Sequence, residues 1–294
     1  MDTAHWCIFA WLIIVSSVHG SKKKGYGIDL QAFKCGDLDA LTNIRWWYNW
    51  DSNFGDIETA SGCTINDKYL APFVPMIWSY NPNWSTSTYS VDDRNEFILG
   101  FNEPNHVSQA NLSPQVAAYN WNIIENAAKG KMLIVSPAAA PCSGGSTNCI
   151  SDTFAWFDDF FRILCGDPVV PCRVDYLATH HYSCNAQSTM VFLQQLYDRY
   201  GLKIWLTEFA CPNSYSPLEQ LDYMTDLLPF LEEADYVYRY AWYVHRRASP
   251  DAFISEHANL FETGTSVLTD LGQYYNNFKV EEPVPASVCR ANRK

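Results

Sequence analysis

Several common signatures are missing from this sequence, and each absence argues against a class of protein. Its 10 cysteines form no Cys-x-x-Cys pair, so neither metal nor redox chemistry is indicated. No Gly-x-Ser-x-Gly elbow occurs, which disfavours a serine esterase. Basic residues are the minority, with 20 Lys and Arg against 32 Asp and Glu. The formal charge of −12 disfavours nucleic acids and anionic membranes as partners and suits a neutral ligand.

The N-terminal stretch is typical of a secretory signal. An apolar run over Cys7–Val18 is followed by the small residues of His19-Gly20-Ser21. The run is too short to span a membrane. No Lys or Arg precedes it, and Lys22–Lys24 follow it, so an uncleaved anchor is the alternative. We predict that residues 1–20 are a signal peptide and that the protein is extracellular, with no membrane contact after cleavage.

The cysteines and two sequons also favour export. Asn83-Trp84-Ser85 and Asn111-Leu112-Ser113 are glycosylation sequons, and the following Pro114 weakens the second. Several cysteines lie close together in the sequence, as in proteins of oxidising compartments. The expected disulfides are Cys142–Cys149, Cys165–Cys172, Cys184–Cys211 and Cys35–Cys63, which leaves Cys289 over.

The chain has the size and pattern of one barrel domain. With 294 residues and 48% hydrophobic content it can bury a large core, and no internal repeat or long linker divides it. It contains eight short apolar runs, the number that a closed parallel barrel needs. The expected strands are Gly25–Asp29, Ile44–Asn49, Phe73–Trp78, Phe97–Glu103, Met132–Pro137, Val174–His181, Lys203–Glu208 and Tyr236–Trp242. The expected helices are Ser113–Ile124, Phe154–Cys165, Thr189–Tyr200, Pro217–Glu232 and Leu268–Phe278. We predict an α/β fold, a single (β/α)8 TIM barrel over residues 21–280, followed by an irregular tail over 281–294.

Two of these runs end in a carboxylate, Glu103 and Glu208. In a parallel barrel every strand delivers its carboxyl end to one shared face, so groups far apart in sequence can meet there. Glycoside hydrolysis needs one carboxylic acid to protonate the leaving oxygen and a second, ionised carboxylate to attack the sugar or activate water. We predict that the two residues form such a catalytic pair. The alternative is a pair of solvated strand ends.

The end of the fourth strand poses a geometric problem. Successive strand residues point to opposite faces, so Asn102 and Glu103 both face a pocket only if the strand bends there. Pro104 has no N–H and would end the ladder at this point. Gly100 would allow close approach of a ligand, with barrel packing as the alternative role.

Six motifs, in their order along the chain, resemble those of glycoside hydrolase family 128. They are Trp46-Trp47-Tyr48-Asn49-Trp50, Phe73-Val74-Pro75-Met76-Ile77-Trp78, Leu99-Gly100-Phe101-Asn102-Glu103-Pro104-Asn105, Thr179-His180-His181-Tyr182, Ile204-Trp205-Leu206-Thr207-Glu208-Phe209-Ala210 and Arg239-Tyr240-Ala241-Trp242. The resemblance spans about residues 25–278. It implies a barrel enzyme that cleaves internal β-1,3-glucan linkages with retention, using Glu103 as acid/base and Glu208 as nucleophile. Asn105-His106 replaces an acidic residue common in the family, and His180-His181-Tyr182 departs from its His-aromatic-Tyr pattern; both bear on subsite preference.

Retention makes a prediction about distance. The two carboxyl groups should lie about 5–5.5 Å apart, whereas a separation near 8 Å would indicate inversion. As the general acid, Glu103 is expected to have a raised pKa, while Glu208 stays ionised.

Aromatic residues make up 15% of the chain and include 11 Trp, and sugar rings stack well on aromatic faces. We predict that Trp242 forms the floor beneath the sugar whose bond breaks. Asn102 would bond the 2-hydroxyl of that sugar, with a strand-end cap as its alternative role. His181 and Tyr182 would orient Glu208 or donate to a hydroxyl, with a structural role as the alternative. The other expected substrate-binding residues, each with the core as its alternative position, are Tyr48, Asn49, Trp50 and Trp78.

Adjacent strand residues diverge, so His180 and His181 are not expected to bind a metal together, and no third ligand is evident. We expect no metal and no cofactor. The prediction is a secreted, retaining endo-β-1,3-glucanase whose partner is its polysaccharide substrate. The alternatives are another β-glycanase of the same barrel clan, such as a mannanase, or a non-catalytic β-glucan-binding protein on the same fold. The oligomeric state is left open.

Overall fold

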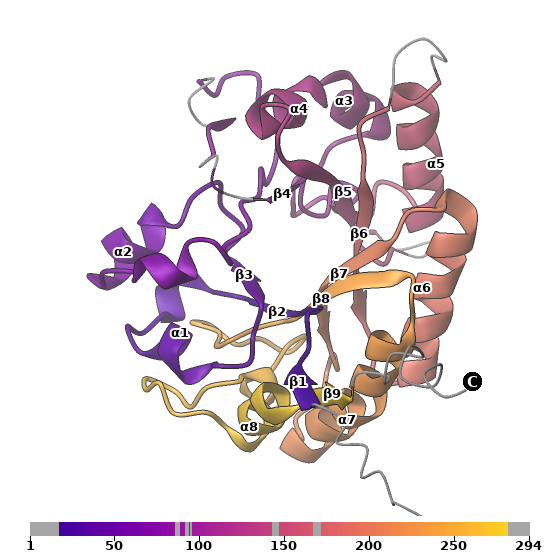
Figure 1. Cartoon of the computed structure of the whole chain (residues 1–294). Helices are drawn as coiled ribbons and strands as arrows, with labels where there is room; N and C mark the ends of the chain where they lie inside the picture. Colours follow the sequence, from indigo (N-terminus) through magenta and orange to yellow (C-terminus); the bar gives the residue numbers. More distant parts are fainter. Residues whose placement is uncertain are drawn as a thin grey trace, which may run out of the picture.

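Seven parallel strands curl around a common centre, with helices outside them (Figure 1). The computed structural model describes residues 18–85, 89–91, 94, 96–142, 147–166 and 172–281. The strands follow one another in the order β3-β2-β8-β7-β6-β5-β4. Their bounds are β2 Lys24–Gly27, β3 Trp46–Tyr48, β4 Phe97–Leu99, β5 Leu133–Ala139, β6 Tyr176–Tyr182, β7 Ile204–Ala210 and β8 Val237–Trp242. Each coincides with a predicted strand to within a few residues.

The remaining predicted strand, Phe73–Trp78, closes the ring between β3 and β4. It is reduced to two parallel bridges, from Phe73 to Trp47 and from Met76 to Leu99. Pro75 has no N–H, so this segment makes no continuous ladder, although the Pro75 carbonyl accepts a hydrogen bond of 2.9 Å from the Leu99 N–H. The predicted fold class, a single (β/α)8 barrel, is confirmed.

The helices largely follow the predicted pattern. The segment expected as one helix from Ser113 divides in two at Asn120, whose φ of −109° lies outside the helical range. Ser113 caps the first of these helices as expected, its Oγ accepting a bond from the Val116 N–H. The short helices α1 and α2 were not predicted. The bounds are α1 Asp37–Ala40, α2 Gly55–Ser61, α3 Pro114–Tyr119, α4 Asn122–Ala128, α5 Thr153–Leu164, α6 Ala186–Tyr200, α7 Pro217–Glu233 and α8 Asp270–Asn277, with 3-10 turns at η1 Leu30–Ala32, η2 Asp67–Tyr69 and η4 Glu256–Ala258.

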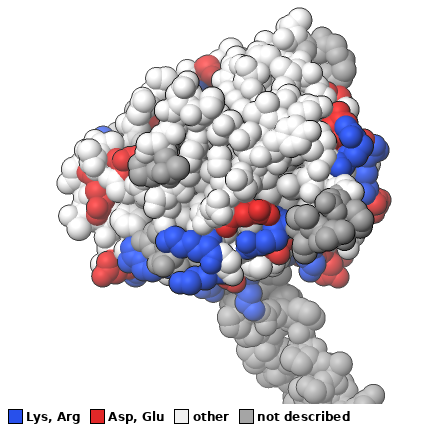
Figure 2. Space-filling model, turned by 90° about the horizontal axis from the view of Figure 1, so that it is seen from above, with Lys and Arg blue, Asp and Glu red and all other residues white. Residues whose placement is uncertain are grey.

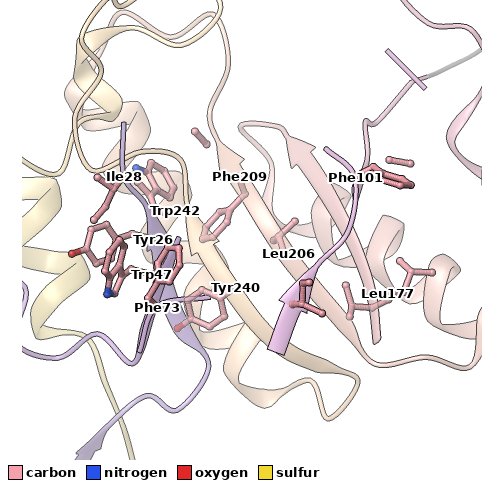
Figure 3. Close-up of a cluster of buried hydrophobic side chains, with 14 of the residues drawn as sticks. Tyr26, Ile28, Trp47, Phe73, Phe101, Leu177, Leu206, Phe209, Tyr240 and Trp242 are labelled. Atoms are coloured by element: carbon pink, nitrogen blue, oxygen red, sulfur yellow. The ribbon is translucent and has the colours of Figure 1, made fainter. Parts of the chain in front are cut away.

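Strand alternation divides the apolar side chains into two cores. Trp46 and Tyr48 point into the barrel and pack with residues such as Phe97 and Trp205. Trp47 points outward and joins the larger core between the sheet and the helices, part of which Figure 3 shows. The barrel interior is therefore filled with side chains, and the free ends of the strands are left to form a site.

Two lysines explain the basic segment that follows the predicted signal peptide. The Nζ of Lys23 donates to the carbonyls of Leu231, Glu232 and Ala234 at the end of α7. The Nζ of the fully buried Lys24 donates to the carbonyls of Tyr275, Asn276 and Phe278 at the end of α8. A cation at a helix C-terminus satisfies otherwise unpaired carbonyls and complements the helix dipole. Burial lowers the pKa of Lys24 to about 8.

We expect the substitution Lys24→Met to lower the free energy of unfolding by about 3 kcal/mol, because it leaves buried carbonyls without a donor. The melting temperature should fall by roughly 6–12 °C, as measured by calorimetry or circular dichroism. Lys34 is exposed, and Lys34→Met should change stability by no more than about 0.5 kcal/mol. Equal small effects of both substitutions would contradict the capping role of Lys24.

A second, two-stranded sheet joins the chain ends of the described region. β1 (Val18–Gly20) pairs antiparallel with β9 (Lys279–Glu281). The predicted signal peptide and C-terminal tail otherwise lie outside the described residues, as do Cys7 and Cys289. All four predicted disulfides are present: Cys35–Cys63, Cys142–Cys149, Cys165–Cys172 and Cys184–Cys211.

Two surface properties complete the description. Among the described residues, no helix has both the length and the apolar character needed to cross a membrane. Figure 2 shows one side of the molecule, on which blue Lys and Arg residues lie beside red Asp and Glu residues along one edge. The face drawn there is otherwise largely uncharged.

Candidate active site

The chain bends sharply where Glu103 follows β4. β4 ends at Leu99, and Asn102 makes a single bridge to Ala138 at the end of β5. Glu103 then has a φ of 43°, in the left-handed region that few non-glycine residues adopt. The predicted bend is therefore present, and it lets both Asn102 and Glu103 line the same hollow.

Gly100 serves packing. A Cβ at this position would lie 2.8 Å from the Trp121 ring and 2.9 Å from the backbone of Ser136 and Pro137. Close approach of β5 therefore requires glycine here, which selects the packing role over the ligand role.

The pairing of β6 with β7 places a histidine opposite Glu208. The register shifts after Thr179, so that His180 pairs with Glu208. Because strand residues alternate, Tyr182 lies on the same side as His180, and His181 lies on the other. His181 bonds Thr189 of α6 at 3.0 Å and stacks on Phe192, with its pKa lowered to about 4 by burial.

His180 lies between the two carboxylates. Its Nδ1 is 2.8 Å from Glu103 Oε1 and 3.3 Å from Glu208 Oε2. Glu208 also accepts hydrogen bonds from the Trp50 Nε1–H, at 2.7 Å, and from the Tyr182 hydroxyl. One oxygen from each carboxylate and one nitrogen of His180 all lie within 4.8 Å of one another. The three groups can therefore share or exchange protons.

Burial and charge shift the pKa values of this cluster. Burial lowers the pKa of His180, but the charge of Glu208 and the hydrogen bond and charge of Glu103 outweigh it, so that the pKa is raised. Burial raises the pKa of Glu208, since only 5% of the residue is exposed. The charge of His180 lowers this pKa, and the charge of Glu103 raises it. The hydrogen bonds from Tyr182 and Trp50 also lower it, but the net shift is upward. Desolvation is thus the largest influence on the Glu208 carboxyl, and the ionised state predicted for it is favoured by His180, Tyr182 and Trp50.

Within the part of the chain that the structure describes, two groups have the donor atoms for a metal ion. In the first, Glu103, His180 and Glu208, the donor atoms already bond one another or Trp50 and Tyr182. In the second, Cys184 and Cys211 join Glu219, but the two sulfurs form a disulfide and so offer no thiolate. The hydrogen bonds of the first group favour acid–base chemistry there.

Two adjoining hollows meet at the carboxylate pair. Their volumes are about 360 and 520 Å³, and both are lined by Glu103, Gln109, Glu208 and Tyr243. A larger cavity of about 810 Å³ lies beside the N-terminal ends of α7 and α8, away from both carboxylates. We place the site at the paired hollows, because Glu103 and Glu208 line both of them and do not line the larger cavity.

Several predicted substrate-binding residues line these hollows. Trp50, Trp78, Asn49 and Asn102 line the smaller one, and Tyr182 lines the larger. The Asn49 side chain also braces its own loop, since its Nδ2 donates to the Asn53 carbonyl. The Oδ1 of Asn102 is buried and has no hydrogen-bond partner among the described residues.

Three predicted substrate-binding residues lie elsewhere. Trp242 is fully buried among core aromatics and donates to the Ala258 carbonyl, so it does not form a sugar-binding floor. Tyr48 is fully buried inside the barrel, where its ring lies 4.8 Å from that of Trp50 and supports it from below. His181 faces α6, as described above. Strand alternation turns Trp242 and His181 away from the hollow, whereas Tyr48 points into the barrel and is buried there.

Sequence reasoning missed His180, Tyr243 and Gln109. His180 could have been predicted from strand alternation. If Tyr182 reaches Glu208, then His180, two residues earlier on the same side of the strand, does so too. Tyr243 directly follows Trp242, which was predicted to bind substrate. Because adjacent side chains point in opposite directions, Trp242 lies in the core and Tyr243 lines the hollows. Gln109 lies in the loop after Glu103, where no periodic pattern exists to indicate its direction.

Comparisons with known proteins show the family of this chain. A family model described as the glycosyl hydrolase catalytic core matches residues 30–275. The structure is similar to a subgroup II endo-β-1,3-glucanase of family GH128 from Sorangium cellulosum, with 32% identity, a TM-score of 0.70, and coverage of 87% of this chain and 98% of that one. It also shares the fold of a subgroup III curdlan-specific exo-β-1,3-glucanase from Blastomyces gilchristii, with 24% identity, a TM-score of 0.67, and coverage of 88% and 99%.

The chain is also similar in sequence to a curated protein that is longer than itself. Alkali-sensitive linkage protein 1 of Schizosaccharomyces pombe is 30% identical over 270 residues, which are 85% of this chain and 44% of the relative. The chain thus spans less than half the length of that relative. The chain belongs to the glycosyl hydrolase catalytic core family, within glycoside hydrolase family 128.

Proposed function

We propose that the protein is a secreted, retaining endo-β-1,3-glucanase with Glu208 as nucleophile and Glu103 as acid/base. The observation that carries this proposal is the approach of the two carboxylates, whose nearest oxygens lie within 4.8 Å where the two hollows meet. Inversion needs room for a water molecule between substrate and base, at roughly 6.5–9.5 Å between carboxyl groups. The short separation supports the covalent, retaining route.

The surroundings of each carboxylate support the division of roles. Glu208 is held by two donors, Trp50 and Tyr182, which fix its oxygens for attack on the anomeric carbon. Glu103 lies at the tip of the bend, and 12% of its side chain is exposed, which leaves it room to reach the leaving oxygen. Glu208 would form a bond to the sugar as Glu103 protonates the departing oxygen, and Glu103 would then deprotonate the water that releases the product.

His180 and Asn102 have supporting roles in this proposal. Protonated His180 would donate to Glu103 and stabilise the negative charge on Glu208, keeping both oriented. Asn102 Oδ1 would accept a hydrogen bond from a hydroxyl of the attacked sugar, since a buried amide oxygen without a partner is costly. The smaller hollow, which Asn102 lines, would then hold the attacked sugar, and the larger hollow the leaving side.

Endo action is supported by the open space on both sides of the carboxylate pair, because a chain passing through the site needs room for sugars in both directions. Secretion is supported by the four disulfides, which persist in oxidising compartments. The exposed position of Asn83 is compatible with its predicted glycosylation.

The test is incubation of the purified protein with soluble β-1,3-glucan and, in parallel, with mannan. Early products of several lengths would indicate endo action, whereas release of glucose alone would indicate exo action. Retention would be indicated if proton NMR showed the β-anomer as the product formed first. Cleavage of mannan instead of glucan would favour the mannanase alternative, and binding of glucan without cleavage would favour the non-catalytic one.

The pH dependence should report on the carboxylate cluster. We expect kcat/KM to fall on the acid side as Glu208 takes up a proton, because a neutral carboxylic acid is a poor nucleophile. Since the pKa of Glu208 is raised, this fall should begin above the usual glutamic acid range. The positive charge of His180 lowers the pKa of Glu208, so His180→Asn should move the acid limb to higher pH. An acid limb that stays in place would contradict this coupling.

A further inference from the structure

Phe253 is a large aromatic side chain held in an exposed position at the wall of the larger hollow. It follows β8 by eleven residues, is 46% exposed, and lines the hollow together with Tyr182 and Glu208. Its ring packs edge-on against Tyr182, with centroids 5.0 Å apart and planes at 65°. The side chain therefore stays partly exposed at the wall of the hollow.

The loop that carries Phe253 is well fixed. Asp251 Oδ1 accepts hydrogen bonds from the N–H groups of Phe253, at 3.0 Å, and Ile254, at 2.8 Å. The other Asp251 oxygen pairs with Arg247 at 3.0 Å. The Phe253 carbonyl accepts a bond of 2.7 Å from the Asn213 N–H in the loop after β7. A loop braced at both ends keeps the ring exposed, although burying it would be favourable.

The position of this ring matches what a sugar chain needs. A pyranose presents a flat face of C–H groups that packs on an aromatic ring, and the ring is rigid before the ligand arrives, so little conformational entropy is lost on binding. The larger hollow lies across the carboxylates from Asn102, on the leaving side of the bond to be cleaved. Arg247 lines the same wall and offers N–H donors for hydroxyl groups.

We infer that Phe253 is the platform on which a glucose unit on the leaving side stacks, so that the enzyme favours chains that extend beyond the cleaved bond. This inference rests on the proposed function and deepens it. Binding energy on the leaving side is available only to substrates that carry a sugar there. Loss of the ring should therefore penalise oligosaccharides while sparing substrates with a minimal leaving group.

The test compares Phe253→Ala, Phe253→Tyr and Phe230→Ala with the wild-type enzyme. Phe230 lies on α7 and is 45% exposed, so it is a matched control away from the site. One substrate set is a series of β-1,3-linked glucose oligosaccharides. The other is the β-fluoride of the β-1,3-linked disaccharide, whose leaving fluoride places no sugar in the larger hollow.

Phe253→Ala should lower kcat/KM about tenfold on the longer oligosaccharides, mainly through KM, and leave the fluoride within about twofold of wild type. Phe253→Tyr should restore activity on oligosaccharides, and Phe230→Ala should behave as wild type. Equal losses on both substrates would assign Phe253 a structural role through Tyr182 and overturn the inference. The inference would also be overturned if Phe253→Ala had the same kcat/KM on oligosaccharides as Phe230→Ala. That result would leave the proposed function intact. A wild-type protein that cleaves neither substrate would overturn the proposed function and this inference together.

Discussion

Replacing Glu208 by Gln is expected to lower kcat on β-1,3-glucan by about 10⁴-fold or more, with binding of the glucan retained. Glutamine has nearly the same shape, but its amide is not a nucleophile able to form the glycosyl intermediate. Its amide also has a single acceptor oxygen, so one of the two donors to Glu208, Trp50 or Tyr182, would face an N–H₂ group instead. The measurements are reducing-sugar release for activity and titration calorimetry with an oligosaccharide for affinity.

The control for this experiment is Glu233→Gln, which changes the charge equally at an exposed position at the end of α7. It should retain wild-type activity. Adding azide to a Glu208→Ala protein offers a second check, because the shorter side chain leaves space for a small anion to attack the sugar in place of the missing carboxylate. A Glu208→Gln protein that turns over at the wild-type rate would remove Glu208 from the nucleophile role and with it the proposed mechanism.

The second large effect concerns a buried ion pair behind the site. Arg246 and Asp37 are both almost fully buried, and the guanidinium donates to both carboxylate oxygens at 3.1 Å. It also donates to the carbonyls of Ala32, Glu262 and Thr265. These bonds tie the loop after β8 to the loop after β2, parts of which line the smaller hollow.

We expect Arg246→Met to lower the free energy of unfolding by about 3–5 kcal/mol, because the Asp37 carboxylate is left buried without its counterion. The melting temperature should fall by roughly 6–20 °C. Adding Asp37→Leu should restore part of the loss, since no unpaired charge is then buried. Chemical denaturation of the three proteins measures these differences.

The matched comparison is Arg162→Met on α5. Arg162 also pairs with an aspartate, Asp159, at 2.8 Å, but both side chains are about half exposed or more. A pair in water contributes about 0–1 kcal/mol. If Arg246→Met cost no more than Arg162→Met, the buried pair would not be what holds these loops together.

Local sequence was enough to predict the parts of the site that depend on strand ends. Apolar runs that stop at Glu103 and Glu208 mark the ends of β4 and β7, and a parallel barrel brings all such ends to one face. Two of the four disulfides were also predictable from spacing, since they join cysteines only seven residues apart. The closing strand was predicted as well, although Pro75 leaves it only isolated bridges.

Other features depended on register, which a run of apolar residues does not specify. The shift after Thr179 decides that His180 faces the carboxylates and His181 the helices. The same dependence on side-chain direction puts Trp242 in the core and Tyr243 in the site. In the sequence Lys24 stands out only as part of a basic segment after the predicted signal peptide, and the folded chain shows that it caps α8.

The amino-acid order by itself determined the barrel, its two short-range disulfides and the presence of two carboxylates at the strand ends, because each follows from short-range composition and from the geometry common to parallel barrels. Packing in three dimensions decided which neighbours those carboxylates meet and how deeply they are buried. Burial raises the pKa of Glu208, and His180 acts on it from another strand. Electrostatic energies depend on distances and solvent exposure across the whole fold, and these exist only once the chain has closed.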